Sequence, residues 1–207
     1  MLKRTKGRLL ITLLVVTGLA GTINNNSISQ QERKYVLSLL KDSKNNLLDG
    51  VEKLSGNQLN YKSPLSQVSV KNCVIQTALT EKKIWGLVSA AMKQPANPEK
   101  RVNLKLSDMQ LVEMAESGQF SMFSTNTFKQ ANSPWKNIPD ALTGFKNMRN
   151  EHIRYMKSST EDLRNHIILT PAGWVDCYQF ILLLSATTNH CAQVIENIKA
   201  EEFFPGK

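Results

Sequence analysis

Apolar residues recur along this chain at intervals of three and four, which is the spacing of one face of an α-helix. The first such stretch opens at Ser29, and Glu32 three residues later completes the spacing of a capping box. We therefore predict a helix that begins near Ser29. Its inward stripe is Val36, Leu40, Ser43, Leu47, Val51 and Leu54.

A second helix is predicted over residues 69–93, after a polar connection at residues 56–67 in which Pro64 indicates a loop. Pro95 and Pro98 end this helix, because proline cannot continue the hydrogen-bond ladder. Its stripe is Val70, Val74, Thr77, Ile84 and Val88.

Residues 99–137 have the pattern of a long crossover with one short helix in it. Ser107 and Gln110 have capping-box spacing, and the helix that they open extends to Gly118. The following stretch, residues 119–137, is rich in Ser, Thr, Asn and Phe, and we expect it to be irregular.

Two further helices complete the pattern. One has Pro139 in its first turn and the stripe Ala141, Phe145, Met148, His152 and Met156; the last covers residues 174–199. Strand signals are nearly absent. The periodicity therefore predicts an all-α fold, a four-helix bundle over residues 29–199 with a long crossover between helices 2 and 3.

The first residues have the anatomy of a secretory signal peptide. A basic start, Lys3 to Arg8, precedes a weakly polar to apolar run over residues 9–20. Near the end of this run, Gly18 and Ala20 supply the small side chains of a cleavage site. The run is shorter than the ~20 residues that cross a bilayer comfortably. We expect residues 1–22 to be a signal peptide and the protein to be periplasmic or secreted. The alternative is an uncleaved segment that anchors the chain in the membrane.

The charge of the chain argues against a nucleic-acid partner. The formal net charge is +9, and four of the positive charges lie in the predicted signal peptide, which leaves about +5 for the mature chain. No dense block of Lys and Arg remains, whereas a nucleic-acid footprint needs clustered basic residues and a reading element.

Three cysteines, Cys73, Cys177 and Cys191, lie among apolar helical neighbours, and no two have CxxC spacing. This setting favours small buried thiols. The alternative is one disulfide between two of them, and the sequence does not give its connectivity.

Two segments match motifs of a known family. Residues 186–190, with His190 last and Gln193 after it, match a His-x-x-x-His pattern that is followed by glutamine. Residues 68–76 match a Trp-Ser-x-x-Glu-x-x-x-His pattern, with Val68 at the tryptophan and Gln76 at the histidine. Further matches are Glu81, Leu163-Arg164-Asn165-His166 and Gly173.

In this order and spacing, over about residues 32–198, the chain resembles the DinB/YfiT-like superfamily of four-helix bundles. The resemblance implies three histidines from two helices around a divalent metal such as Zn or Ni. It also implies a hydrolase or thiol transferase that uses a metal-bound nucleophile, and a homodimer.

At the three matching ligand positions this chain has Gln76, Ala186 and His190. Positions 186 and 190 share a helix face, but alanine has no donor atom and an amide oxygen is a poor zinc ligand. We therefore expect a degenerate metal site at His190 and Gln76, no cofactor, and a hydrogen bond between these two side chains in the core. A shifted site that uses Cys73 or Cys191 is the alternative.

The other candidate residues have structural interpretations. We expect His152 in or near the core, without an evident partner, and His166 as a brace for the loop before the last helix. Glu81, Asp176 and Glu196 have no pairing evident in the sequence. Trp85, Trp135 and Trp174 are packing residues in this interpretation.

These observations predict an exported, non-catalytic bundle that binds an unknown small ligand or a protein partner, with membrane contact only through the N-terminal segment. The alternative is a divalent-metal-dependent hydrolase or thiol transferase with a modified site.

Overall fold

The computed structural model describes residues 28–120, 133–135 and 137–206, and this part is mostly helical. The predicted signal peptide at residues 1–22, and residues 121–132 of the stretch expected to be irregular, lie outside the described residues. The elements are α1 (Gln30–Val51), α2 (Gly56–Asn60), α3 (Val70–Ala91), the 3₁₀ helix η1 (Pro98–Asn103), α4 (Asp108–Glu116), α5 (Ile138–Ser158), β1 (Ile167–Thr170), β2 (Gly173–Asp176) and α6 (Cys177–Ala200).

Helices α1 and α4 begin at the caps that the sequence predicts. Ser29 Oγ accepts a hydrogen bond from the Glu32 N–H, and the Glu32 carboxylate accepts one from the Ser29 N–H, as predicted. Ser107 and Gln110 do the same for α4, and α5 has its proline in the first turn. These local bonds satisfy the first N–H groups of each helix, which have no partner within it.

The prediction was wrong about where the last helix begins, and it missed a short helix in each of two connections, α2 and η1. The last helix starts at Cys177, because residues 173–176 form strand β2, which pairs antiparallel with β1. Gly173, with a φ of +114°, allows the tight turn between the strands. The connection at residues 56–67 also contains a short helix, α2, which Ser55 and Gln58 cap reciprocally.

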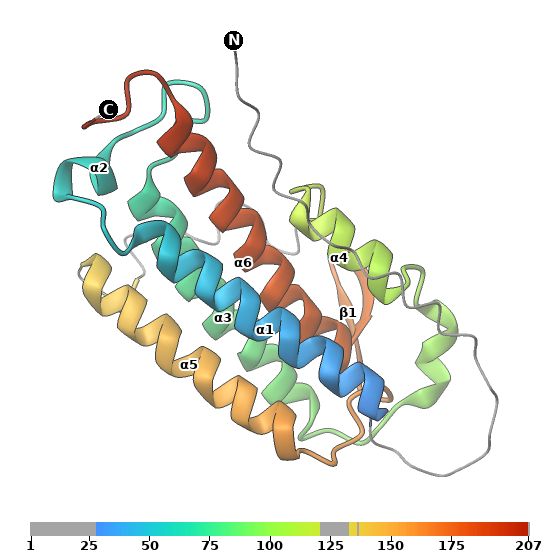
Figure 1. Cartoon of the computed structure of the whole chain (residues 1–207). Helices are drawn as coiled ribbons and strands as arrows, with labels where there is room; N and C mark the ends of the chain where they lie inside the picture. The colour runs from blue at the N-terminus through green and yellow to red at the C-terminus, as the bar shows by residue number, and fades with distance from the viewer. Residues whose placement is uncertain (1–27, 121–132, 136, 207) are drawn as a thin grey trace.

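The four long helices lie side by side, as Figure 1 shows. Helices α1 and α3 each pack against α5 and α6, and α4 packs on a further face of α6. Since α6 has neighbours on three sides, its first ten residues, Cys177 to Ala186, are all buried.

The buried apolar residues form two clusters, one toward each end of the long helices. The first cluster includes Leu40, Ile84, Met156 and Leu183, and the second includes Leu47, Val74, Phe145 and Ile195. Between them, on all four helices, the sequence passes through a buried polar residue. These residues, which we call the polar layer, are Ser43 on α1, Glu81 on α3, Arg149 and His152 on α5, and Thr188 on α6.

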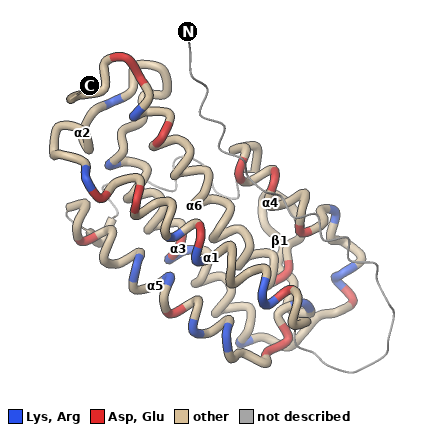
Figure 2. Tube along the Cα trace, in the orientation of Figure 1, with Lys and Arg blue, Asp and Glu red and all other residues tan. Residues whose placement is uncertain are grey.

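Charged residues of both signs are interspersed over the helices and their connections (Figure 2). Within the described part of the chain, no helix is both long and apolar enough to cross a membrane.

Candidate functional site

The polar layer is centred on an ion pair between α3 and α5. Arg149 is fully buried, and its guanidinium holds the Glu81 carboxylate with two hydrogen bonds, Nε to Oε1 at 2.8 Å and Nη2 to Oε2 at 2.6 Å. This fork-to-fork geometry is the strongest arrangement available to an arginine and a carboxylate.

The remaining donors of Arg149 reach the other two long helices. Nη1 donates to the Leu40 carbonyl at 3.1 Å and to Ser43 Oγ at 2.7 Å, both on α1. Nη2 donates to the Leu184 carbonyl and to Thr188 Oγ1, both at 2.9 Å, on α6. One side chain thus connects α1, α3, α5 and α6 at the same level.

His152 completes the layer on the side of α5. Its Nδ1 lies 2.7 Å from Glu81 Oε1, and its ring stacks on Trp85 with the ring centroids 4.0 Å apart. Burial alone would raise the pKa of Glu81, but the charge of Arg149 and the hydrogen bonds from Arg149 and His152 outweigh it and lower this pKa. The Glu81 carboxylate is therefore ionised, and it is fully enclosed by protein. In this position it links the helices inside the bundle.

The structure does not bring together the residues at the expected metal positions. Gln76 is exposed on α3, while Ala186 is buried in the first apolar cluster. His190 turns toward α4, where its Nδ1 lies 3.0 Å from the Glu116 carbonyl. The predicted hydrogen bond between His190 and Gln76 is replaced by this contact with α4.

Helical phase explains the orientation of His190. Its neighbour Cys191 points at α3 and donates to the Cys73 carbonyl at 3.2 Å. Since adjacent residues diverge by about 100° around a helix, His190 cannot also face α3. Across residues 28–120, 133–135 and 137–206, no three His, Cys, Asp or Glu side chains are grouped so that they could hold a metal ion.

A second charged cluster joins the starts of three helices. Arg164, in the loop before β1, pairs with Glu32 at the start of α1, Asp108 at the start of α4 and Asp176, the N-cap of α6. The guanidinium also lies 4.0 Å from the ring centroid of Tyr178. Acidic groups suit helix N-termini, and the arginine neutralises part of the charge that they concentrate there.

The prediction that His166 braces the loop before the last helix is confirmed. Its Nδ1 lies 2.7 Å from the Asp162 carbonyl within the loop, and its Nε2 lies 3.1 Å from the Gln94 carbonyl after α3. Glu196, the other carboxylate without an evident partner in the sequence, pairs with Lys199 one turn along α6.

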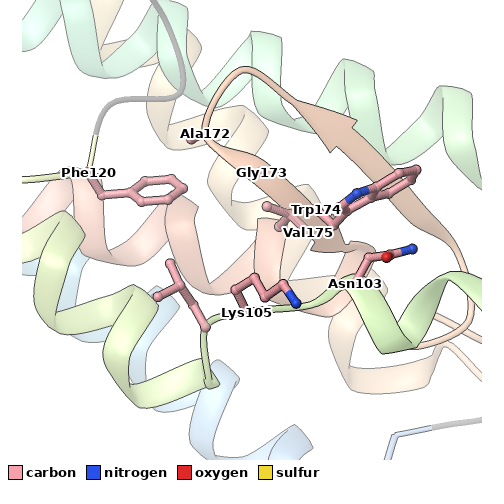
Figure 3. A pocket seen from close by; sticks show the side chains of 8 residues that line it. Asn103, Lys105, Phe120, Ala172, Gly173, Trp174 and Val175 are labelled. Atoms are coloured by element: carbon pink, nitrogen blue, oxygen red, sulfur yellow. The ribbon is translucent and has the colours of Figure 1, made fainter.

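A cleft of about 160 Å³ opens between the β-hairpin and the connection from η1 to α4. Figure 3 shows that Phe120, Lys105 and Trp174 surround it from three segments of the chain. Apolar groups form most of the lining, and Asn103 and Lys105 supply polar ones. Lys100 adds a second ammonium group, 5.8 Å from the centroid of the Trp174 ring.

The sequence reasoning missed Arg149, although its position carries a signal. Arg149 lies four residues after Phe145 and three before His152, so it shares their buried stripe. Glu81 occupies the corresponding place between Ala78 and Ile84 on α3. A charged residue within an apolar stripe indicates that it has some buried partner, since an unpaired charge there is strongly unfavourable.

Comparison with protein-family models, with curated proteins and with solved structures finds no match to this chain.

Proposed function

We propose that this protein is an exported, non-catalytic DinB-like four-helix bundle that has lost the family's metal site and binds a small organic ligand in the cleft beside its β-hairpin. The observation that carries the proposal is the use of His190, the one histidine at the three matching positions, to hold α6 against α4. Gln76 is exposed on α3 and Ala186 has no donor atom, so the matching positions give His190 no second protein ligand with which to hold a metal.

The course of the helices through the two apolar clusters supports a bundle with a crossover. Helices α1 and α6 pass from the first cluster to the second, whereas α3 and α5 both pass from the second to the first. Two consecutive long helices that run in the same direction need a connection that returns along their length. Residues 92–137, which include η1 and α4, are long enough to provide it.

The polar layer supports a structural rather than catalytic centre. The guanidinium of Arg149 donates its hydrogen bonds to Glu81 and to groups of α1 and α6, and the side chain of His152 is 2% exposed. General acid–base catalysis requires a group within hydrogen-bond reach of a substrate. A carboxylate and an imidazole that are enclosed in this way hold the helices in register instead.

The lining of the cleft favours a ligand with an apolar ring and one negative charge. Phe120, Leu106 and Val175 supply apolar contacts, and Trp174 supplies an aromatic ring at the edge. Lys105, which also lines the cleft, supplies an ammonium group that can pair with an anion. Apolar walls with a few polar groups are common in small-molecule sites, and a volume of about 160 Å³, below the roughly 300 Å³ at which pockets for drug-sized ligands begin, limits the ligand to about a single ring.

Ligand-observed NMR on the full chain tests this assignment, with benzoate as the anionic probe and benzyl alcohol as its neutral match. We expect benzoate to bind with a Kd in the millimolar range, since a fragment of this size gains only about 4 kcal/mol. Lys105→Gln should weaken benzoate about two- to fivefold and leave benzyl alcohol unchanged. Trp174→Ala should weaken both probes.

Lys146→Gln, on the exposed side of α5, is the matched control and should change neither affinity. Benzoate binding that is indifferent to both cleft substitutions, or no binding of either probe at millimolar concentration, would overturn the ligand assignment.

Export is the part of the proposal that the N-terminal sequence supports, and it places the mature chain in a periplasmic or extracellular setting. Expression of the full chain in a bacterial host, followed by fractionation and N-terminal sequencing of the product, tests both export and cleavage after Ala20 or the residues beside it.

A further inference from the structure

Two of the three cysteines meet between α3 and α6. Cys191 Sγ donates to the Cys73 backbone carbonyl at 3.2 Å. Both residues are buried in the second apolar cluster. A sulfur that reaches the partner residue's carbonyl at this distance shows that α3 and α6 approach closely here, and a disulfide needs such an approach, with Cα atoms about 4.4–6.8 Å apart.

The third cysteine is excluded from any pairing with these two. Cys177 lies in the first apolar cluster, about fourteen residues before Cys191 on the same helix, which is roughly 21 Å along the axis. Burial and the negative charges of Asp176 and Glu161 raise the pKa of its thiol to about 12. Of the three pairings that the sequence leaves open, the structure retains one.

We propose that Cys73 and Cys191 form a disulfide that joins α3 to α6 when the chain folds in the presence of a small-molecule disulfide such as oxidised glutathione. The two thiols lose two electrons and two protons, and a sulfur–sulfur bond forms between them. The oxidant takes up the electrons and protons as its own sulfur–sulfur bond breaks, giving two molecules of reduced glutathione. This proposal does not depend on the ligand cleft.

Exchange with glutathione proceeds through a thiolate and a mixed disulfide. During refolding, one of the two cysteines forms the mixed disulfide, and the other displaces the glutathione from it when α3 and α6 pack together.

The test uses the full chain, unfolded in guanidinium with reductant and refolded in a buffer of reduced and oxidised glutathione. Acid quenching, alkylation under denaturing conditions and intact mass then count the free thiols, and peptide mapping without reduction identifies any linked pair. Cys177→Ser is the matched control, because it removes the cysteine that should take no part.

We expect one free thiol in the wild-type chain and none in Cys177→Ser. Cys73→Ser and Cys191→Ser should each keep both remaining thiols free, and the two variants serve as independent checks if one folds poorly. Reductant should lower the denaturation midpoint of the wild type and of Cys177→Ser, but not of the other two variants. Three free thiols in the refolded wild type, or a linked pair that contains Cys177, would overturn the proposal.

Discussion

Removal of one partner of the buried Glu81–Arg149 pair should destabilise the protein far more than removal of both. Glu81→Leu leaves a fully buried guanidinium without its carboxylate, and breaking a buried ion pair in this way costs about 3–5 kcal/mol. For a chain of this size that corresponds to a fall in Tm of about 6–20 °C. Arg149→Met should cost a similar amount, because it leaves the carboxylate with His152 alone.

The double variant Glu81→Leu/Arg149→Met should recover most of this loss. Ser43 Oγ and Thr188 Oγ1 each already donate to a carbonyl of their own helix, at 2.7 Å, so they stay satisfied when the guanidinium is gone. Only His152 loses its acceptor, at a cost of about 1–2 kcal/mol. We therefore expect the double variant within about 2 kcal/mol of the wild type, with a coupling energy of at least about 4 kcal/mol.

Urea denaturation of the wild type, both single variants and the double variant, followed by far-UV circular dichroism, measures this cycle. Additive losses in the double variant would refute the reasoning, because they would mean that the two side chains act independently. Single variants that each lose less than about 1 kcal/mol would refute it as well, since a solvated pair costs that little to break.

Three further predictions follow from other contacts. Folding lowers the pKa of Glu81, so this carboxylate stabilises the fold above its usual pKa of 4.5, and the stabilisation is lost as the pH falls below that value. The urea midpoint should therefore fall less steeply at acidic pH in Glu81→Gln than in the wild type. Gly118→Ala should lower the free energy of unfolding by more than about 1 kcal/mol, because φ is +75° there and the new Cβ would lie 2.7 Å from Cε1 of His190. The control Gly86→Ala meets no atom and should raise this free energy by about 0.5–1 kcal/mol; thermal denaturation measures both. Arg164→Met should cost about 3 kcal/mol in urea because it leaves three carboxylates together, and Arg154→Met, whose pair is exposed, should cost less than about 0.5 kcal/mol.

Sequence reasoning reached the long helices because their signals are local. The Ser29–Glu32 and Ser107–Gln110 pairs form their hydrogen bonds within one turn, and the apolar stripes repeat with the helical period. The hairpin at residues 167–176 was missed because it has no such local, repeating signal. Its strands have four residues each, too few to establish a period, and the second continues directly into the apolar start of α6.

The pairing within the polar layer could not be predicted, because it depends on which helices face each other. Glu81 and Arg149 are 68 residues apart, and their separate positions in apolar stripes do not identify the partner. The orientation of His190 could not be predicted for the same reason. Its spacing from Ala186 defines a shared face of α6, but only the packing of α3 and α4 around that helix decides that the face at His190 meets α4.

Elemental analysis of the purified protein and of its His190→Ala variant decides between a structural role for His190 and the metal site that the resemblance to DinB-like bundles implies. Both proteins are equilibrated with Zn²⁺ and then with Ni²⁺ and freed of unbound metal by gel filtration. We expect about one tenth of an equivalent of metal or less in both proteins, which is the background of weak surface sites, and we expect the variant to be folded and slightly less stable. One equivalent in the wild type that is lost in His190→Ala would contradict the account and restore a metal-dependent enzyme.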